Sequence, residues 1–140
     1  SSDVCSSDLA PTFTADASGT YVISLIVNDG KLDSAMVAVT VTATAVNAAP
    51  VANAGTAQTV ATASVVTLNG SGSTDANRDA LTYKWALTSK PASSTAALSS
   101  ATAVNPTFTA DLAGVYVASL IVNDGQVDST VATVPITAGP

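Results

Sequence analysis

The 140-residue sequence contains no histidine and a single cysteine, Cys5, and all ten of its acidic residues are aspartates. The lack of histidine removes the commonest general base and the commonest zinc ligand. One cysteine can form neither an internal disulfide nor a thiolate metal site. No Gly-x-Ser-x-Gly nucleophile motif is present. These absences argue against an enzyme.

Charged residues are also scarce. They make up 10% of the chain, and the formal net charge is −6. The four basic residues are dispersed, so the sequence has no basic patch for nucleic acid or an anionic membrane surface. The apolar runs are too short to cross a bilayer. We therefore expect no nucleic-acid partner and no membrane insertion in this segment.

The residues that are abundant favour an all-β fold. Valine, threonine, alanine and serine dominate, and asparagine, aspartate and glycine mark the turns. β-Branched residues are enriched in strands, while the best helix formers are rare here.

The sequence repeats itself. Residues 11–43 return as residues 106–138, and 21 of the 33 aligned positions are identical. A fixed period is typical of a serial array of one folded unit. The repeat predicts the C-terminal part of a first unit over residues 10–43, a linker over 44–49 and a complete unit over 50–138.

Residues 1–9 (SSDVCSSDL) have no counterpart in the second copy. Back-translated, they resemble a sequencing-library adapter, so we interpret them as an adapter-derived artefact and exclude them from the fold. The alternative is a native, disordered leader. In the first interpretation the chain is a truncated reading frame, and Cys5 is not native.

Within the complete unit, short segments alternate between apolar and polar residues. In residues 81–88 (LTYKWALT), Tyr83 and Trp85 share one face, which is typical of a half-buried antiparallel strand. Seven or eight such strands, including a short one over residues 96–99, predict an immunoglobulin-like antiparallel β-sandwich. Pro135 predicts a sheet edge at its position. The expected core contains Val66, Leu68, Tyr83, Trp85, Phe108, Tyr116, Leu120, Val122 and Val134.

Several motifs carry a family resemblance. They are PVANAG (50–55), TLNGSGSTD (67–75), LTYKWALTSKP (81–91), NPTFTAD (105–111) and GVYVASLIVNDG (114–125). Together they resemble the PKD (polycystic kidney disease) family. Because ALTSKPASS follows Trp85 where many members have a WDFGDG-like run, the similarity is greater to the variant grouped with REJ-type repeats. The resemblance implies an immunoglobulin-like sandwich in extracellular or cell-surface proteins, without catalysis.

Two aromatic residues have structural interpretations. Trp85 could stack on a sugar, but its alternation favours a place between the sheets. Tyr116 is similar to the corner tyrosine of immunoglobulin-like folds, and Ala118 stands where immunoglobulin domains carry a cysteine.

A calcium site is the one candidate metal site. Asp75, Asn77 and Asp79 alternate in one loop, and calcium prefers six to eight oxygen ligands. Oxygens from neighbouring loops could come from Asn53, Asp124 and Asp128. Arg78 places a positive charge within this loop, and the alternative is that these side chains only cap turns.

The partial first unit presents a physical problem, because its apolar face has no opposing sheet. We expect a hairpin that packs less well than the complete unit, with Phe13 more exposed than Phe108. Overall, the sequence predicts a non-catalytic extracellular or cell-surface spacer with neighbouring repeats as partners and a role in protein or carbohydrate interaction. The alternatives are an accessory binding module of a secreted hydrolase and a structural module of a phage or viral fibre.

Overall fold

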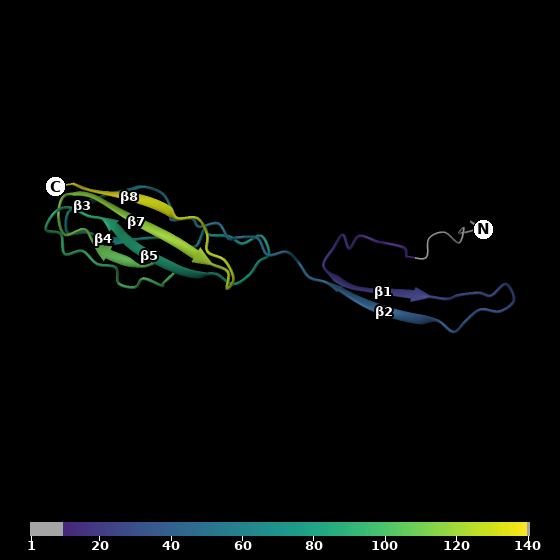
Figure 1. Ribbon diagram of the computed structural model, residues 1–140. Helices are drawn as coiled ribbons and strands as arrows, with labels where there is room; N and C mark the ends of the chain where they lie inside the picture. Colours follow the sequence, from purple (N-terminus) through teal and green to yellow (C-terminus); the bar gives the residue numbers. More distant parts are fainter. Residues whose placement is uncertain (1–9, 140) are drawn as a thin grey trace. The chain divides into compact units, whose positions relative to one another are not determined.

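The computed structural model describes residues 10–139, so the interpretation of residues 1–9 as an artefact lies outside the described residues. The chain divides into two compact units, of which the first ends at Val46 and the second begins at Asn47 (Figure 1). The predicted all-β class is confirmed, because every regular element within residues 10–139 is a strand. None of these residues belongs to a helix long and apolar enough to span a membrane.

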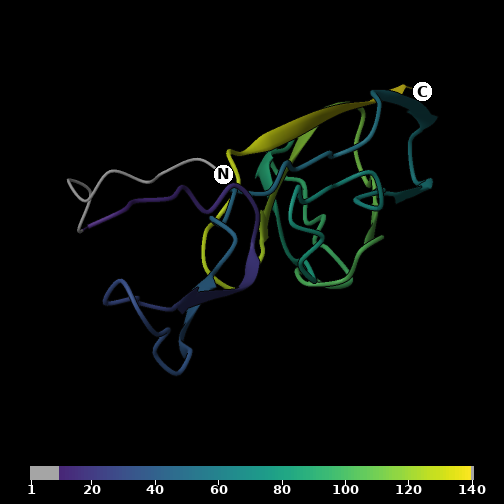
Figure 2. The ribbon, with the colours of Figure 1, turned by 90° about the vertical axis from the view of Figure 1, so that its right-hand side faces the viewer.

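The second unit consists of two sheets. The larger has the strand order β3-β8-β7-β5, and the smaller pairs β4 with β6. In Figure 1 the yellow β8 runs beside the green β7, and Figure 2 shows β8 along one margin of this unit. The strands are β3 (Gln58–Ala61), β4 (Val65–Thr67), β5 (Thr82–Ser89), β6 (Thr107–Thr109), β7 (Gly114–Asn123) and β8 (Ala132–Gly139).

Strand register places the apolar side chains of β5, β7 and β8 on one face. Trp85 pairs with Leu120 across β5 and β7, and Tyr116 pairs with Ile136 across β7 and β8, both in antiparallel ladders. Because side chains alternate along a strand, these paired residues point to the same side of the sheet. The one departure from antiparallel pairing is β3, which runs parallel to β8.

The core lies between the two sheets and includes side chains from both. Trp85 is 2% exposed and Tyr116 is fully buried, and the indole Nε1 has no hydrogen-bond partner among the described residues. Tyr83 is partly buried and packs against this core. The other residues expected in the core are all buried: Val66, Leu68, Phe108, Leu120, Val122 and Val134.

Two details of the predicted strands change. The prediction of a strand over residues 96–99 is wrong, and the second unit has six strands. This alanine- and serine-rich segment makes only isolated contacts, such as the Ser99 amide on the Thr107 carbonyl at 2.7 Å. At Pro135, β8 pairs only with β7, since the β3 ladder begins one residue later at Ile136. A proline lacks the amide that a second ladder would need.

The first unit is a single hairpin of β1 (Gly19–Leu25) and β2 (Val37–Ala43). Its register aligns Tyr21 with Val41, but almost all of its residues are exposed. Phe13 is 50% exposed, whereas its counterpart Phe108 is 3% exposed. The expectation of poorer packing in the partial unit is therefore confirmed.

Candidate functional site

The preceding linker is held by two loops of the second unit. The Asn47 side-chain amide donates to Asp124 Oδ2 at 2.8 Å, and the Ala48 backbone amide donates to Asn77 Oδ1 at 2.8 Å. We call these four residues the linker clasp. They bring together the loop after β7, the loop before β5 and the start of the unit, which Pro50 then continues as a buried residue.

The turn that contains Asp124 orients its carboxylate for this contact. Its Oδ1 accepts hydrogen bonds from the amides of Gln126 and Val127, both at 2.7 Å, and its side chain is 7% exposed. The amide of Val127, the side chain of Asn47 and the amide of Gln126 lower the pKa of Asp124 below its usual value. The carboxylate therefore stays ionised and presents Oδ2 to the linker.

The first unit contains the same turn without the clasp. Asp29 Oδ1 accepts from the amides of Lys31 and Leu32, and these bonds lower its pKa. Asn28 and Asp33 are bonded through their side chains at 2.6 Å, as Asn123 and Asp128 are at 2.7 Å. The turn is thus a local product of the repeated sequence, and in the second unit its outer carboxylate oxygen also accepts from Asn47.

The loop with the alternating oxygens closes on itself. Asp75 Oδ1 accepts from the Asp79 amide at 2.9 Å, and Arg78 between them has a positive φ of 67°. Asp75 Oδ2 is buried without a partner among the described residues. The Asp79 side chain is exposed.

The residues predicted as calcium ligands therefore make hydrogen bonds in different parts of the unit. Asp124 and Asn77 hold the linker, and Asn53 Oδ1 accepts from the Gly55 amide at 2.9 Å. Within residues 10–139 no three carboxylates gather in a group that could hold a metal ion. Among the candidate ligand oxygens in that range, Asp75 Oδ2 is the buried one that has no hydrogen-bond partner. These hydrogen bonds are those expected of the turn-capping alternative, and the calcium site stays a prediction.

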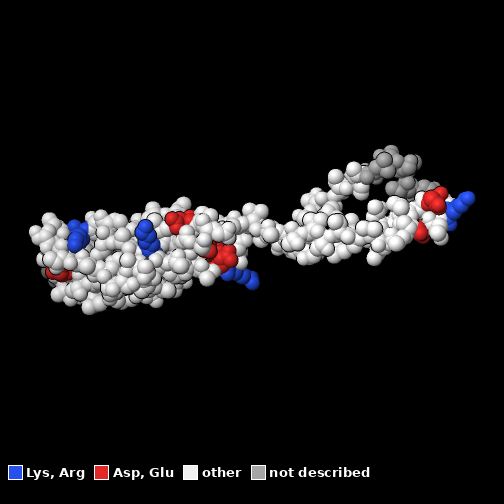
Figure 3. All heavy atoms as spheres, turned by 60° about the horizontal axis from the view of Figure 1, so that its bottom comes forward, with Lys and Arg blue, Asp and Glu red and all other residues white. Residues whose placement is uncertain are grey.

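Charged side chains are sparse on the face that Figure 3 shows. Figure 3 shows the lysine, arginine and aspartate side chains as a few isolated groups on an otherwise uncharged face.

A second polar network secures the corner between β6 and β7. The Tyr116 hydroxyl accepts from the Leu112 amide at 2.9 Å, and its single proton is shared between the Leu112 carbonyl at 2.8 Å and Asp111 Oδ1 at 2.9 Å. Asp111 also accepts from the Ser94 hydroxyl and the Thr95 amide. The hydrogen bond from the Ser94 hydroxyl, and to a smaller extent that from the Thr95 amide, hold the pKa of Asp111 well below its usual range.

The sequence predicted part of these two networks. The corner tyrosine was expected, and its geometry recurs in the first unit, where Tyr21 contacts the amide and carbonyl of Ala17. Sequence reasoning missed Asn47, Ser94 and Asp111 as partners. The identity of Asp111 and Asp16 between the repeats was a usable signal, but nothing comparable marked Asn47 or Ser94.

The low pKa of Asp111 predicts a loss of stability in acid. Because the pKa of Asp111 is lower in the folded chain, the carboxylate contributes its full stabilisation above the unfolded pKa of about 4. This contribution is lost as the pH falls from there toward the folded pKa. Chemical unfolding between neutral and acidic pH should show a steeper decline for the wild type than for Asp111→Asn. Ser94→Ala should give an intermediate slope. Equal slopes for wild type and Asp111→Asn below the unfolded pKa would contradict this role.

We also expect the thermal midpoint of the chain to be the same in millimolar calcium and in excess chelator. A cation that binds only the folded state would raise the midpoint by mass action. Asp75→Asn serves as the control, because it removes the negative charge of the carboxylate whose Oδ2 has no hydrogen-bond partner among the described residues. A calcium-dependent rise that Asp75→Asn abolishes would contradict this expectation and support the metal site.

Comparisons with known proteins place this fold in a family. The profile described as "K319L-like, PKD domain" matches residues 54–138. Among curated proteins, none is similar enough in sequence to count as a match. The solution structure of the PKD domain from the KIAA 1837 protein is 26% identical with a TM-score of 0.54, and the match covers 70% of this chain and 97% of that domain.

A second solved structure is a longer protein. It is a nucleoside hydrolase-related hypothetical protein from Saccharophagus degradans that is associated with carbohydrate metabolism, 20% identical with a TM-score of 0.58. The match covers 66% of this chain but only 26% of that protein, and at this identity it supports the fold alone. The family match spans more than half of the sequence, so this chain belongs to the K319L-like PKD domain family.

Proposed function

We propose that the chain is a non-catalytic extracellular segment that acts as a spacer and interaction module within a larger surface or secreted protein. The observation that carries the proposal is the linker clasp, in which loops of the second unit hold Asn47 and Ala48, the first residues of that unit. A module that holds its own linker transmits position along a chain more faithfully than one on a free tether. Family membership supports the assignment.

The dimensions of the unit suit a spacer. Its longest strand, β7, has ten residues and therefore spans about 33 Å at the usual rise per residue. The core is closed by packing alone, without a disulfide among the described residues, whose sequence contains no cysteine. Each such unit would extend a stalk by about one strand length.

The proposal gives no residue a catalytic role. The chain has no histidine, and the aspartates with lowered pKa values, such as Asp111 and Asp124, are tied into hydrogen bonds that shape corners and turns. A general base needs a pKa near the working pH and access to a substrate proton, and these carboxylates offer neither.

The clasp can be tested by measuring backbone mobility in the full chain. In the wild type, heteronuclear nuclear Overhauser effects at residues 47–49 should match those of the folded second unit. Asn47→Ala should lower the values at these residues and leave the thermal midpoint nearly unchanged, while Thr44→Ala, outside the clasp, should change neither. Wild-type residues 47–49 as mobile as the chain ends would refute the spacer proposal.

A further inference from the structure

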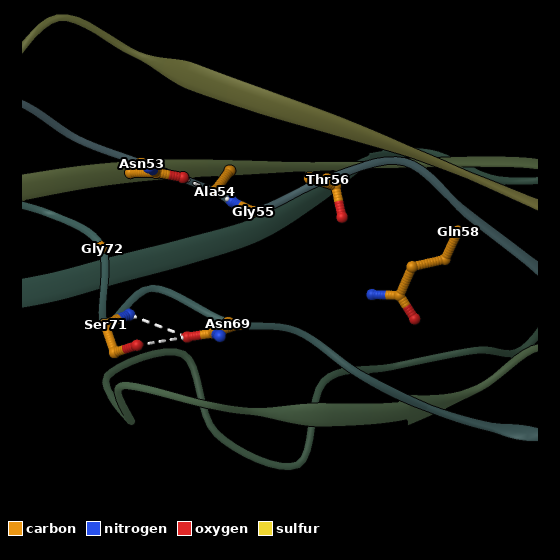
Figure 4. A pocket seen from close by; sticks show the side chains of 8 residues that line it. All are labelled: Asn53, Ala54, Gly55, Thr56, Gln58, Asn69, Ser71 and Gly72. Atoms are coloured by element: carbon orange, nitrogen blue, oxygen red, sulfur yellow. Dashed lines mark hydrogen bonds between the residues drawn. The ribbon is translucent and has the colours of Figure 1, made fainter.

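The second unit contains a hollow that the spacer role does not use. It has a volume of about 550 Å³ and lies between residues 53–58, which lead into β3, and the turn at residues 69–72, which follows β4. Figure 4 shows these two segments on opposite sides, with the side chains of Thr56 and Gln58 extending into the space between them. None of the lining residues is charged or aromatic.

Small residues keep the hollow open. Gly55 has a positive φ of 83°, which a larger residue adopts only with strain, and a Cβ there would lie 3.3 Å from the Asn69 carbonyl oxygen. A Cβ on Gly72 would come within 2.9 Å of Asn53 Nδ2. The backbone therefore favours glycine at position 55, and a side chain at position 72 would have to displace the Asn53 amide.

Three side-chain amides face this space, and each is held at one end only. Asn53 Oδ1 accepts from the Gly55 amide, and Asn69 Oδ1 accepts from the amide and the hydroxyl of Ser71 at 3.0 and 2.7 Å. Gln58 Nε2 donates to the Thr67 carbonyl at 3.0 Å. These bonds fix which end of each amide remains available.

The remaining ends form a set of hydrogen-bonding groups. The nitrogens of Asn53 and Asn69 are donors, Gln58 Oε1 is an acceptor and the Thr56 hydroxyl is both. None of the three amide ends has a hydrogen-bond partner among residues 10–139. Groups that are oriented in advance lose little conformational freedom when they bind a ligand.

We propose that this hollow binds a neutral sugar. A sugar hydroxyl both donates and accepts, which matches an alternation of amide donors, an amide acceptor and a hydroxyl. An ionic ligand would find no counter-charge among the lining residues. The absence of an aromatic ring on which the sugar could stack predicts weak, millimolar affinity. The inference rests on the interaction part of the proposed function and gives it a ligand class and a location.

The test is a titration of the ¹⁵N-labelled full chain followed by NMR. The probes are the methyl glycosides of glucose, galactose and mannose, with glucuronic acid as the charged comparison. We expect at least one neutral glycoside to shift the side-chain amide signals of Asn53, Asn69 and Gln58 in a saturable way, with a smaller effect from glucuronic acid. No saturable shift with any glycoside at millimolar concentration, or shifts that map elsewhere, would overturn the proposal.

Variants separate the site from general effects of the sugar. Thr56→Val and Gln58→Leu each remove one hydrogen-bonding group, which should weaken binding roughly two- to tenfold. Thr59→Val makes the same change as Thr56→Val on an exposed residue of β3 that does not line the hollow, so its affinity should equal that of the wild type. Equal weakening in all three would overturn the site, and if a variant unfolds, the wild-type shift map decides.

The two proposals fail in different ways. Ordered residues 47–49 together with absent sugar shifts would leave the spacer role and remove the sugar site. Mobile residues 47–49 with saturable shifts at the three amides would remove the spacer role and retain the binding site.

Discussion

A single β-layer with one apolar face needs a second layer to cover it, and the rest of this structure depends on that constraint. The two units allow a direct comparison, because β1 and β2 of the first unit share most of their residues with the segment that forms β7 and β8 of the second. Phe108 is buried where the opposing layer is present, and Phe13 is half exposed where it is not. Burial of this face, rather than any covalent bond, separates a folded unit from a hairpin.

The local hydrogen bonds form in both units, whereas the apolar face is buried only in the second. The corner around Tyr116 and the turn at Asp124 recur around Tyr21 and Asp29 with the same donors and acceptors, although none of residues 10–46 belongs to the buried core. Short-range polar contacts therefore follow from the sequence of the turn alone. This independence lets the second unit use the outer oxygen of Asp124 to hold Asn47 without disturbing its own sheet.

The difference between periodic patterns and contacts distant in sequence explains which features could be predicted from the sequence. Alternation along β5 and β7 predicted that Trp85 and Tyr116 point into a sandwich core, because the period of side chains in a strand is fixed by backbone geometry. The interpretation failed for residues 96–99, where Ser99 bonds to Thr107 of β6 without forming a ladder. The contacts of Asn47 with Asp124, and of Ser94 with Asp111, join residues distant in sequence through single side chains, and no periodic pattern marks them. The hollow near Gln58 likewise arises only when two separate loops face one another.

The most direct test is to supply the first unit with the layer it lacks. Residues 1–10 would be replaced by a second copy of residues 50–105, and amide hydrogen exchange would be measured in β1 and β2. The account predicts strong new protection of β1, similar to that of β7, and a loss of that protection when the copied counterpart of Trp85 is changed to alanine. Exchange in β1 and β2 that stays as fast as in the original chain would show that a covering layer is not what makes this fold.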